Sequence, residues 1–294
     1  MKGKILCISG PTASGKTAYA IRMAKEKNGE VVSCDSMQIY RYMDIGTAKP
    51  SKEEMEGIPH HMLDFVDPWV NYSVAEFVRD ARQCIDDILS RGKLPVLCGG
   101  TGLYIDSIIN QIDFPETKEN PALRRELAAY AGQYGAGALH EKLRAVDPIS
   151  ADRIHPNNIK RVIRAIEVFE ITGKPKSELD LLARKIPVYD GDLICLLPNR
   201  EELYGRINRR VDLMMERGLL DEVKNLLTMG VTREMTAMQA IGYKEIADHL
   251  AGYCSLAEAV EKVKQESRRY AKRQLTWFRR NPDVVWLDSH KVQG

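Results

Sequence analysis

One octapeptide near the N-terminus governs the architecture of this 294-residue chain: Gly10-Pro11-Thr12-Ala13-Ser14-Gly15-Lys16-Thr17. It matches the pattern G-x-x-x-x-G-K-[ST] in full and follows Ile5-Leu6-Cys7-Ile8, an apolar run typical of a buried parallel strand. The glycines let backbone N–H groups converge on phosphate oxygens, and a helix starting near Gly15 adds partial positive charge. Lys16 would neutralise a phosphate, and the Thr17 hydroxyl is placed to ligate Mg²⁺. The octapeptide therefore predicts a site for a di- or triphosphate without identifying the molecule that carries it.

A parallel sheet flanked by helices is indicated by the runs that follow. Val31-Val32-Ser33-Cys34 and Leu94-Pro95-Val96-Leu97-Cys98 are again short apolar runs ended by a polar or glycine turn. Amphipathic helical stretches at about 17–27 and 74–91 separate these runs, and such alternation is typical of βαβ units. Residues 193–197 predict one more buried strand, and helical spacing follows at 203–227 and 256–278. We therefore predict an α/β fold class.

The segment from about 115 to 189 has a different pattern. Its apolar residues recur at helical spacing, as in Val162, Ile166 and Phe169, and no strong strand-like run interrupts them. A length of 294 residues also suggests about two domains. We predict an α/β core formed by residues 1–114 and 190–294, with an all-helical insertion domain at 115–189.

Composition excludes several classes of protein. The chain has no run of about 18 apolar residues and no signal-peptide pattern at its start, so we expect a soluble cytoplasmic protein without a membrane partner. Its six cysteines form no Cys-x-x-Cys pair, which argues against a zinc site and a disulfide framework. We expect a monomer.

The net charge of +2 conceals a segregated basic segment. Residues 264–280 contain seven Lys or Arg residues and one acid, Glu266, a net charge of +6 on a predicted helix. Such a helix suits contacts with nucleic-acid phosphates, although a solvated helix face is the usual alternative for a basic run.

An acidic residue, Asp35, directly follows the predicted strand at 31–34. Ligands of open α/β sheets bind at the carboxyl ends of the strands, so Asp35 is a candidate Mg²⁺ ligand or general base, with a solvated loop acid as the alternative. The strand at 94–98 ends instead in Gly99-Gly100-Thr101, without the acid that an ATPase or GTPase usually has at that point.

Taken together, nine further blocks and the octapeptide closely resemble the bacterial tRNA dimethylallyltransferase (tRNA isopentenyltransferase) family. The blocks are Asp35–Tyr40, Asp44–Pro50, His60–Asp64, Gly99–Tyr104, Arg153–Asn157, Lys160–Arg164, Gly218–Val223, Gln239–Lys244 and Lys272–Arg279. They cover essentially the whole chain in the expected order. Singly they are weakly specific apart from the octapeptide, but as an ordered set they are very specific.

The resemblance implies a core similar to P-loop nucleoside-triphosphate hydrolases and a prenyltransferase activity. Members transfer a dimethylallyl group from dimethylallyl diphosphate to the exocyclic N6 amino group of the adenosine 3′-adjacent to the anticodon of tRNA, and diphosphate is released. The octapeptide, Gly10 to Thr17, would then hold the diphosphate leaving group, with Mg²⁺ as cofactor on Thr17.

Four residues are implied as catalytic: Lys16, Asp35, Thr101 and Arg124. Asp35 would accept the proton of the amino group, because the lone pair of that group is delocalised and makes it a poor nucleophile. Thr101 would donate a hydrogen bond to an oxygen of dimethylallyl diphosphate. The alternative is that its hydroxyl caps the N-terminus of the helix that follows. Arg124 would contact a phosphate, or is simply a solvated helix arginine.

The resemblance also implies a set of residues that contact the tRNA anticodon stem-loop, from which the target base must be extracted. Gln38 would hydrogen-bond a base edge and Met37 would pack on the base face, unless Met37 is core, while Tyr243 offers a stacking ring. The set comprises Asp35, Ser36, Met37, Gln38, Lys160, Arg161, Arg164, Gln239, Gly242, Tyr243, Lys244, Arg269, Lys272, Arg273, Gln274, Thr276, Trp277 and Arg279.

Other functions compete with this interpretation. An ATP-dependent small-molecule or nucleoside kinase would share the fold and use the same octapeptide and Asp35, but would not need the basic helix. A non-catalytic RNA-binding module would leave Lys16, Thr17 and Asp35 without a purpose. An isopentenyltransferase acting on free adenine nucleotides would not need two basic clusters.

Overall fold

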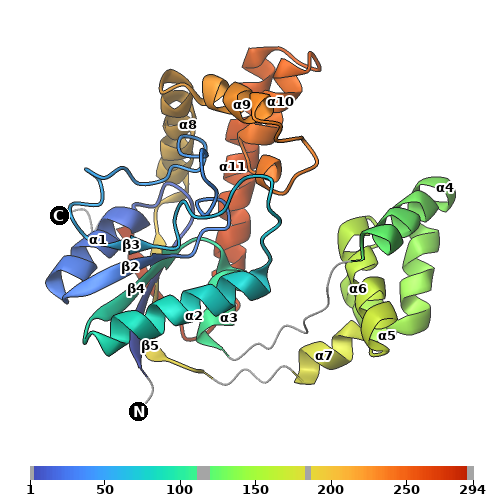
Figure 1. Ribbon diagram of the computed structural model, residues 1–294, viewed down its shortest axis with the longest axis horizontal. Coiled ribbons are helices and arrows are strands. Elements are labelled where there is room, and N and C mark those ends of the chain that lie inside the picture. The colour runs from blue at the N-terminus through green and yellow to red at the C-terminus, as the bar shows by residue number, and fades with distance from the viewer. Residues whose placement is uncertain (1–2, 111–119, 183–186, 290–294) are drawn as a thin grey trace. The chain divides into compact units, whose positions relative to one another are not determined.

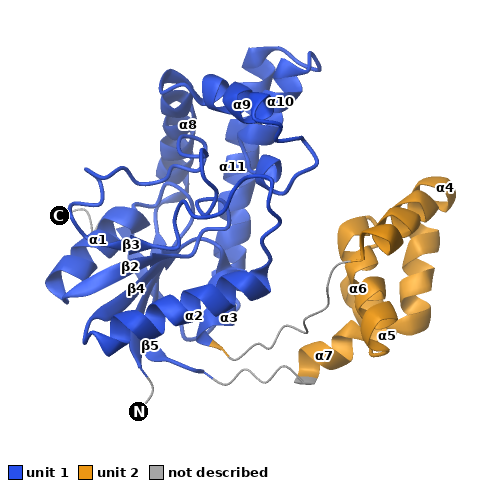
Figure 2. Ribbon diagram, in the orientation of Figure 1, with its two compact units in different colours: residues 1–109, 187–294 blue, residues 110–186 orange. Residues whose placement is uncertain are grey.

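The computed structural model describes residues 3–110, 120–182 and 187–289. The chain forms two compact units, unit 1 with residues 1–109 and 187–294, and unit 2 with residues 110–186 (Figure 2). The first boundary that we predicted, at 114/115, lies outside the described residues. The second, at 189/190, falls a few residues beyond the observed division.

Unit 1 is built on a six-stranded parallel sheet (Figure 1). Its strands are β1 (Lys4–Ser9), β2 (Gly29–Ser33), β3 (His60–His61), β4 (Leu94–Gly99), β5 (Asp190–Leu197) and β6 (Val285–Asp288), in the order β3-β2-β4-β1-β5-β6. The α/β parallel sheet is thus confirmed. Strands β3 and β6 were not predicted, because two and four residues are too short to show a buried-strand pattern.

The helices of unit 1 pack against this sheet or against one another. They are α1 (Lys16–Glu26), α2 (Val74–Ser90), α3 (Gly102–Ile109), α8 (Arg200–Glu216), α9 (Leu219–Thr228), α10 (Tyr243–Leu250) and α11 (Leu256–Phe278), with a short 3₁₀ turn at Ala237–Gln239. The predicted helical region 203–227 is two helices, because Gly218, at a φ of 98°, begins a new one. The predicted helix at 256–278 is α11, and Ser255 caps it in a reciprocal pair with Glu258.

The core of unit 1 lies on both faces of the sheet. On one face Leu6, Val31 and Val96 pack against Ala20 and Ala24 of α1. Figure 1 shows α2 on the opposite face. The carboxyl ends of β2 and β4 approach so closely that a Cβ atom on Gly99 would lie 2.2 Å from the carbonyl oxygen of Cys34. Only glycine allows this approach, which brings together the loops that leave these two strands.

The regular elements of unit 2 within residues 120–182 are helices, as the pattern predicted. They are α4 (Pro121–Val146), α5 (Pro148–Arg153), α6 (Ile159–Thr172) and α7 (Lys176–Leu182). Helix α4 is interrupted at Gly135, at a φ of 87°. Leu127, Leu139 and Leu143 of α4 pack on Val162 and Ile166 of α6, which gives unit 2 a hydrophobic core of its own.

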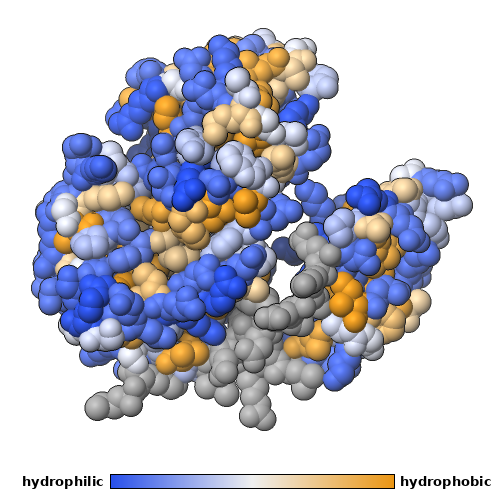
Figure 3. All heavy atoms as spheres, in the orientation of Figure 1, coloured by the Kyte–Doolittle hydropathy of each residue, from blue (hydrophilic) through white to orange (hydrophobic). Residues whose placement is uncertain are grey.

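The face shown in Figure 3 is mostly hydrophilic, with smaller apolar areas between the charged residues. Among the described residues, no helix is both long and apolar enough to cross a bilayer.

Candidate active site

The octapeptide forms the turn between β1, which ends at Ser9, and α1, which begins at Lys16. Gly10 and Gly15 have φ values of 151° and 87°, which favour glycine. A side chain at Gly10 would also meet the hydroxyl of Ser14 at 2.7 Å. The strand, loop and helix predicted for a phosphate-binding site are all present.

Two cations converge on this loop. The ammonium group of Lys16 donates to the carbonyl of Pro11 at 3.4 Å, and the guanidinium of Arg210, from α8, donates to the hydroxyl of Thr12 at 3.4 Å. Burial lowers the pKa of Lys16, and the neighbouring charge of Arg210 lowers it further. The pKa of Arg210 is also lowered by burial. Two desolvated like charges side by side are costly unless an anion compensates them.

The loop also carries a polar atom without a partner. The side-chain oxygen of Ser14 is buried and has no hydrogen-bond partner within the described residues. Buried hydroxyls are normally paired, so this oxygen, together with Lys16 and Arg210, fits a bound anionic oxygen. The described residues therefore suit a phosphate or diphosphate group.

Arg210 was not among the predicted site residues, although its spacing along the helix could have indicated it. It lies three residues after Ile207 and seven after Leu203, so it shares the buried face of α8. An arginine on an otherwise apolar helix face is seldom an ordinary surface residue.

A cavity of about 320 Å³ lies beside the loop. Its polar lining includes Lys16, Thr17, Asp35, Ser36, Arg210, Tyr270 and Arg273, and its apolar lining includes Met37, Ile207, Val211, Met214, Ile241 and Val263. A second cavity, of about 550 Å³, contains Ser14 and Gly15. The two cavities share Lys16, Thr17, Ala48, Arg210 and Met214, so the loop and Arg210 stand where they meet.

Asp35 and Thr101 are brought together at the ends of β2 and β4. One carboxylate oxygen of Asp35 accepts hydrogen bonds from the N–H groups of Met37, at 2.8 Å, and Gln38, at 3.4 Å. The hydroxyl of Thr101 accepts from the N–H of Ser36 at 3.4 Å, while its carbonyl begins α3. The hydroxyl therefore faces the Asp35 loop and does not serve as a helix cap.

A second residue absent from the sequence prediction, Tyr270, lies close to this pair. Burial, followed by the charge of Asp35, raises the pKa of Tyr270 to about 12. Tyr270 comes from α11, so the basic helix also supplies part of the cavity wall.

The side chain of Gln38 forms hydrogen bonds within the protein. Its side-chain carbonyl accepts from the Ser33 hydroxyl at 3.1 Å, and its amide donates to the carbonyls of Thr47 and Ala48, each at 3.1 Å. Gln38 thus joins two parts of one loop, and it also lines the first cavity, so the expected hydrogen bond to a base edge stays a prediction. Met37 likewise lines the first cavity and is not core.

The expectation that Tyr243 offers a stacking ring needs a correction. It is fully buried, and its hydroxyl donates to Glu222 at 2.5 Å, so its ring is not presented for stacking on a base. Gly242, which precedes it, donates its N–H to Glu245 at the start of α10. Gln239 donates to the carbonyl of Arg233 at 2.6 Å and also lines the first cavity, whereas Lys244 is exposed.

On α11, two predicted RNA contacts point inward. Gln274 is buried, accepts from the N–H of Thr12 at 2.9 Å and donates to the carbonyl of Gly100 at 3.1 Å. Trp277 donates to Asp106 at 2.8 Å and packs on Gly102, where a Cβ would lie 2.1 Å from the ring. Both residues dock the helix against the rest of unit 1, and their predicted contacts with RNA stay predictions.

The other predicted residues of α11 stay on its outer side or at the cavity. Arg269 pairs with Glu266 at 2.5 Å, and Arg273 lies over the ring of Tyr270 and lines the first cavity. Lys272, Thr276 and Arg279 are exposed.

In unit 2, Arg124 and Arg164 both bind Glu167. The Arg124 guanidinium makes two hydrogen bonds of 2.8 Å to Glu167, and Arg164 makes one of 2.6 Å. Burial alone raises the pKa of Glu167, but these hydrogen bonds outweigh it and leave the pKa lowered. The structure thus supports a role for Arg124 in holding α4 against α6, and its predicted catalytic contact stays a prediction. Lys160 and Arg161 are exposed at the start of α6.

Comparisons with known proteins point to one family. The family model described as IPP transferase matches residues 38–281, and that described as isopentenyl transferase matches residues 3–70. The tRNA dimethylallyltransferase of Caldanaerobacter subterraneus subsp. tengcongensis is 52% identical, over 98% of this chain and 93% of that protein.

Two solved structures are also similar. The tRNA isopentenylpyrophosphate transferase of Bacillus halodurans is 48% identical with a TM-score of 0.74, over 99% of this chain and 93% of that one. A eukaryotic dimethylallyltransferase acting on tRNA is 33% identical with a TM-score of 0.83, over 98% and 74% of the two chains. The identity, the coverage and the match of a family model to most of the sequence lead to one conclusion: the chain belongs to the tRNA dimethylallyltransferase family.

Proposed function

We propose that the protein transfers a dimethylallyl group from dimethylallyl diphosphate to the N6 amino group of the adenosine 3′-adjacent to the anticodon of tRNA, with release of diphosphate. One observation carries the proposal. The partly buried cations Lys16 and Arg210 lie where the two cavities meet. The Ser14 hydroxyl, which has no hydrogen-bond partner within the described residues, lines the second cavity, and Asp35 lines the first. An anion-binding centre thus adjoins a candidate base.

The loop would hold the diphosphate as a leaving group. The bond between C1 of the donor and the bridging oxygen breaks, and the electron pair stays on the diphosphate. Lys16, Arg210, Ser14 and the backbone N–H groups of the loop stabilise that developing charge without reorganising. This accounts for the two cations at the phosphate-binding loop.

Thr17 is the residue that would hold Mg²⁺. It lines both cavities, and within the described residues no group of three His, Cys, Asp or Glu side chains could form an all-protein metal site. One hydroxyl suits Mg²⁺, which is commonly held by few protein ligands together with substrate phosphates and water. The bound ion would supply charge neutralisation at the diphosphate.

Asp35 would act as the general base. As the bond from N6 to C1 forms, a proton leaves the amino group. The Asp35 carboxylate oxygen that accepts no backbone hydrogen bond from the described residues is available to take that proton. Thr101, held next to Ser36, would donate a hydrogen bond to an oxygen of dimethylallyl diphosphate. The apolar lining contributed by α8 and α11 would receive the prenyl carbons and keep water from the reacting carbon.

The tRNA would be bound through its backbone and through one extracted base. Ser36 and Met37 line the cavity beside Asp35 and would receive the adenine. The exposed residues Lys160, Arg161, Lys244, Lys272, Thr276 and Arg279 would contact phosphates or sugars, and so would Arg269 and Arg273 of α11. A tRNA substrate places the reaction in the cytoplasm, and a monomer would suffice because every proposed residue comes from one chain.

The test separates prenyl transfer from nucleotide chemistry. Purified protein is incubated with Mg²⁺ and unmodified tRNA, and either dimethylallyl diphosphate or ATP. Prenylated adenosine in the first reaction and no ADP in the second support the proposal, whereas ADP formation with unchanged tRNA supports a kinase. Asp35→Ala should lower the single-turnover rate by about 100-fold or more while tRNA affinity is retained. Equal loss of both would contradict the assignment of Asp35 as the base.

A further inference from the structure

The loop of residues 35–59 has little secondary structure to hold it. It contains no helix or strand, apart from an isolated bridge between Tyr40 and Val66. Yet part of this loop, residues 44–48, lines both cavities: Gly46 and Thr47 face the first, Asp44 and Ile45 the second, and Ala48 both. The position of this segment therefore depends on side chains.

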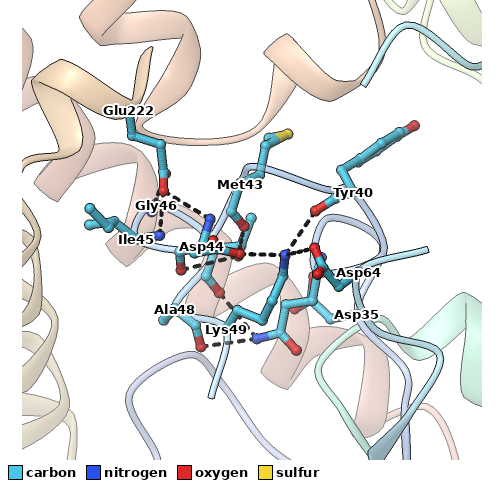
Figure 4. A network of polar contacts seen from close by, with 12 residues as sticks. Asp35, Tyr40, Met43, Asp44, Ile45, Gly46, Ala48, Lys49, Asp64 and Glu222 are labelled. Atoms are coloured by element: carbon cyan, nitrogen blue, oxygen red, sulfur yellow. Dashed lines mark hydrogen bonds and ion pairs between the residues drawn. The ribbon is translucent and has the colours of Figure 1, made fainter. Parts of the chain in front are cut away.

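One carboxylate fixes three consecutive residues of the segment. Glu222, in the first turn of α9, accepts hydrogen bonds from the N–H groups of Asp44, at 2.9 Å, Ile45, at 2.8 Å, and Gly46, at 3.1 Å (Figure 4). Successive N–H groups that converge on one anion form a concave binding site for it. Hydrogen bonds to a charged group are about twice as strong as neutral ones, so a single side chain orients the backbone here.

A second side chain orients that carboxylate. Tyr243 donates its hydroxyl to Glu222 at 2.5 Å, and its ring lies under Gly46, where a Cβ would be 2.4 Å from the ring. Burial and the charge of Glu222 raise the pKa of Tyr243 well above its usual value, so the hydroxyl remains a donor. Helices α9 and α10 thus hold the segment from one side.

Hydrogen bonds and ion pairs also join residues 44–49 to the part of the loop that follows Asp35. Lys49 donates to the carbonyl of Tyr40 at 2.9 Å and pairs with Asp44 and Asp64, at 2.6 and 2.8 Å (Figure 4). Gln38 bonds the carbonyls of Thr47 and Ala48, as described above. A displacement of residues 44–48 would therefore be passed through Gln38 to the turn that Asp35 caps.

We propose that Glu222, oriented by Tyr243, is a positioning residue that sets the wall between the two cavities and so aligns the acceptor amino group with the donor carbon. The inference rests on the proposed function for the reaction it serves. Its structural part, the fixing of residues 44–46 by Glu222, is independent of that function. Reacting groups lose about 100-fold in rate when they are misplaced by about 1 Å. A displacement of this wall should therefore slow the chemical step more than it weakens tRNA binding.

The experiment compares Glu222→Ala with Asp221→Ala, a matched control. Asp221 is the neighbouring acid on α9, 77% exposed, and contacts Lys224 and not the loop. For Glu222→Ala we expect a single-turnover prenylation rate about 100-fold lower at saturating substrates, with tRNA affinity within about threefold of wild type. Amide hydrogen exchange in residues 43–48 should accelerate by at least about tenfold, because three N–H groups lose their acceptor. Asp221→Ala should change neither.

Two milder variants guard against a folding defect. Tyr243→Phe keeps the ring under Gly46 and removes only the hydroxyl, so it should slow the reaction less than Glu222→Ala. The double variant should be no slower than Glu222→Ala, because the hydroxyl acts through the carboxylate. Glu222→Gln keeps one acceptor oxygen and should recover part of the rate.

Several results would overturn the inference: a rate loss without faster exchange in 43–48, faster exchange without a rate loss, equal effects of Asp221→Ala, or additive effects in the double variant. If wild-type protein itself does not prenylate tRNA, the proposed function fails, while the exchange measurement still decides whether Glu222 holds the loop.

Discussion

The side chain of Gln274, on α11, accepts a hydrogen bond of 2.9 Å from the backbone N–H of Thr12, in the phosphate-binding loop. Its amide also donates to the carbonyl of Gly100, in the turn that precedes Thr101. One buried side chain thus joins the basic helix, the loop and the turn after β4. The helix that we propose contacts tRNA is therefore fixed to the loop that we propose binds the donor.

Replacing Gln274 should affect donor binding more than RNA binding. Gln274→Ala leaves the N–H of Thr12 and the carbonyl of Gly100 without a partner, which costs about 1–3 kcal/mol in a buried site. We expect the Kd for dimethylallyl diphosphate, measured by calorimetry, to rise about tenfold, with the Kd for tRNA near the wild-type value. Gln274→Glu retains an acceptor for Thr12 and should lose less. A selective loss of tRNA affinity would show instead that Gln274 contacts RNA.

Removal of the Arg210 charge should slow the chemical step. The guanidinium is partly buried beside Lys16 and the loop, where it would stabilise charge on the leaving diphosphate. Arg210→Gln should lower kcat by about 100- to 1000-fold, as expected for loss of one preorganised group at a developing anion. Arg209→Gln is the matched control, because Arg209 is the adjacent, exposed residue of α8. Similar kcat values for the two variants would exclude Arg210 from the diphosphate site.

The salt dependence of tRNA binding should report the exposed cations of α11. Lys272 and Arg279 are exposed, and neither side chain forms a hydrogen bond or ion pair within the described part of the chain. Each charge that contacts a phosphate adds close to one unit to the slope of log Kd against log salt concentration. Lys272→Gln with Arg279→Gln should therefore reduce the slope by about two units, measured by filter binding over a range of KCl concentrations. Lys224→Gln, which removes a charge paired with Asp221 on α9, should leave the slope unchanged.

Stability towards acid should depend on Glu30, which is buried near the start of β2. Hydrogen bonds from Arg91, then from Lys93 and His61, hold its pKa far below the ordinary value of 4.5. A carboxyl whose pKa is depressed by folding stabilises the protein above its unfolded-state pKa, and that stabilisation is lost as the pH falls towards the folded-state pKa.

Urea unfolding of wild type and Glu30→Gln tests this directly. The difference in the free energy of unfolding should be largest near pH 7 and should narrow as the pH drops below about 4.5. A difference that stays constant from pH 7 to pH 3 would show that the contribution of Glu30 does not come from its charge.

The sequence predicts the sheet and the phosphate loop well, for a local reason. Strands β1 and β4 are continuous apolar runs because both faces of the sheet are covered, and the octapeptide is contiguous with β1 and α1. Strand β3 has two residues and is defined by its pairing with β2, which no local pattern reveals.

The rest of the site depends on contacts between distant segments. Arg210 reaches Thr12 across 198 residues, and Glu222 reaches Asp44 across 178. The family motifs mark Gln38, Tyr243 and Gln274 as important but do not show whether their polar atoms face RNA or the protein. Each proves to be an internal tie, because a loop without strands or helices needs side chains to hold it.

A matched pair of anticodon stem-loops tests whether the protein transfers a dimethylallyl group to the N6 amino group of the adenosine. One carries adenosine 3′-adjacent to the anticodon, and the other carries inosine there, which lacks the exocyclic amino group. Each is incubated with the protein, Mg²⁺ and dimethylallyl diphosphate, and its nucleosides are analysed by mass spectrometry. We expect the adenosine to gain one C5H8 unit, with release of diphosphate, and the inosine stem-loop to remain unchanged. An unmodified adenosine, or a prenyl group on any other nucleoside, would contradict the proposed function.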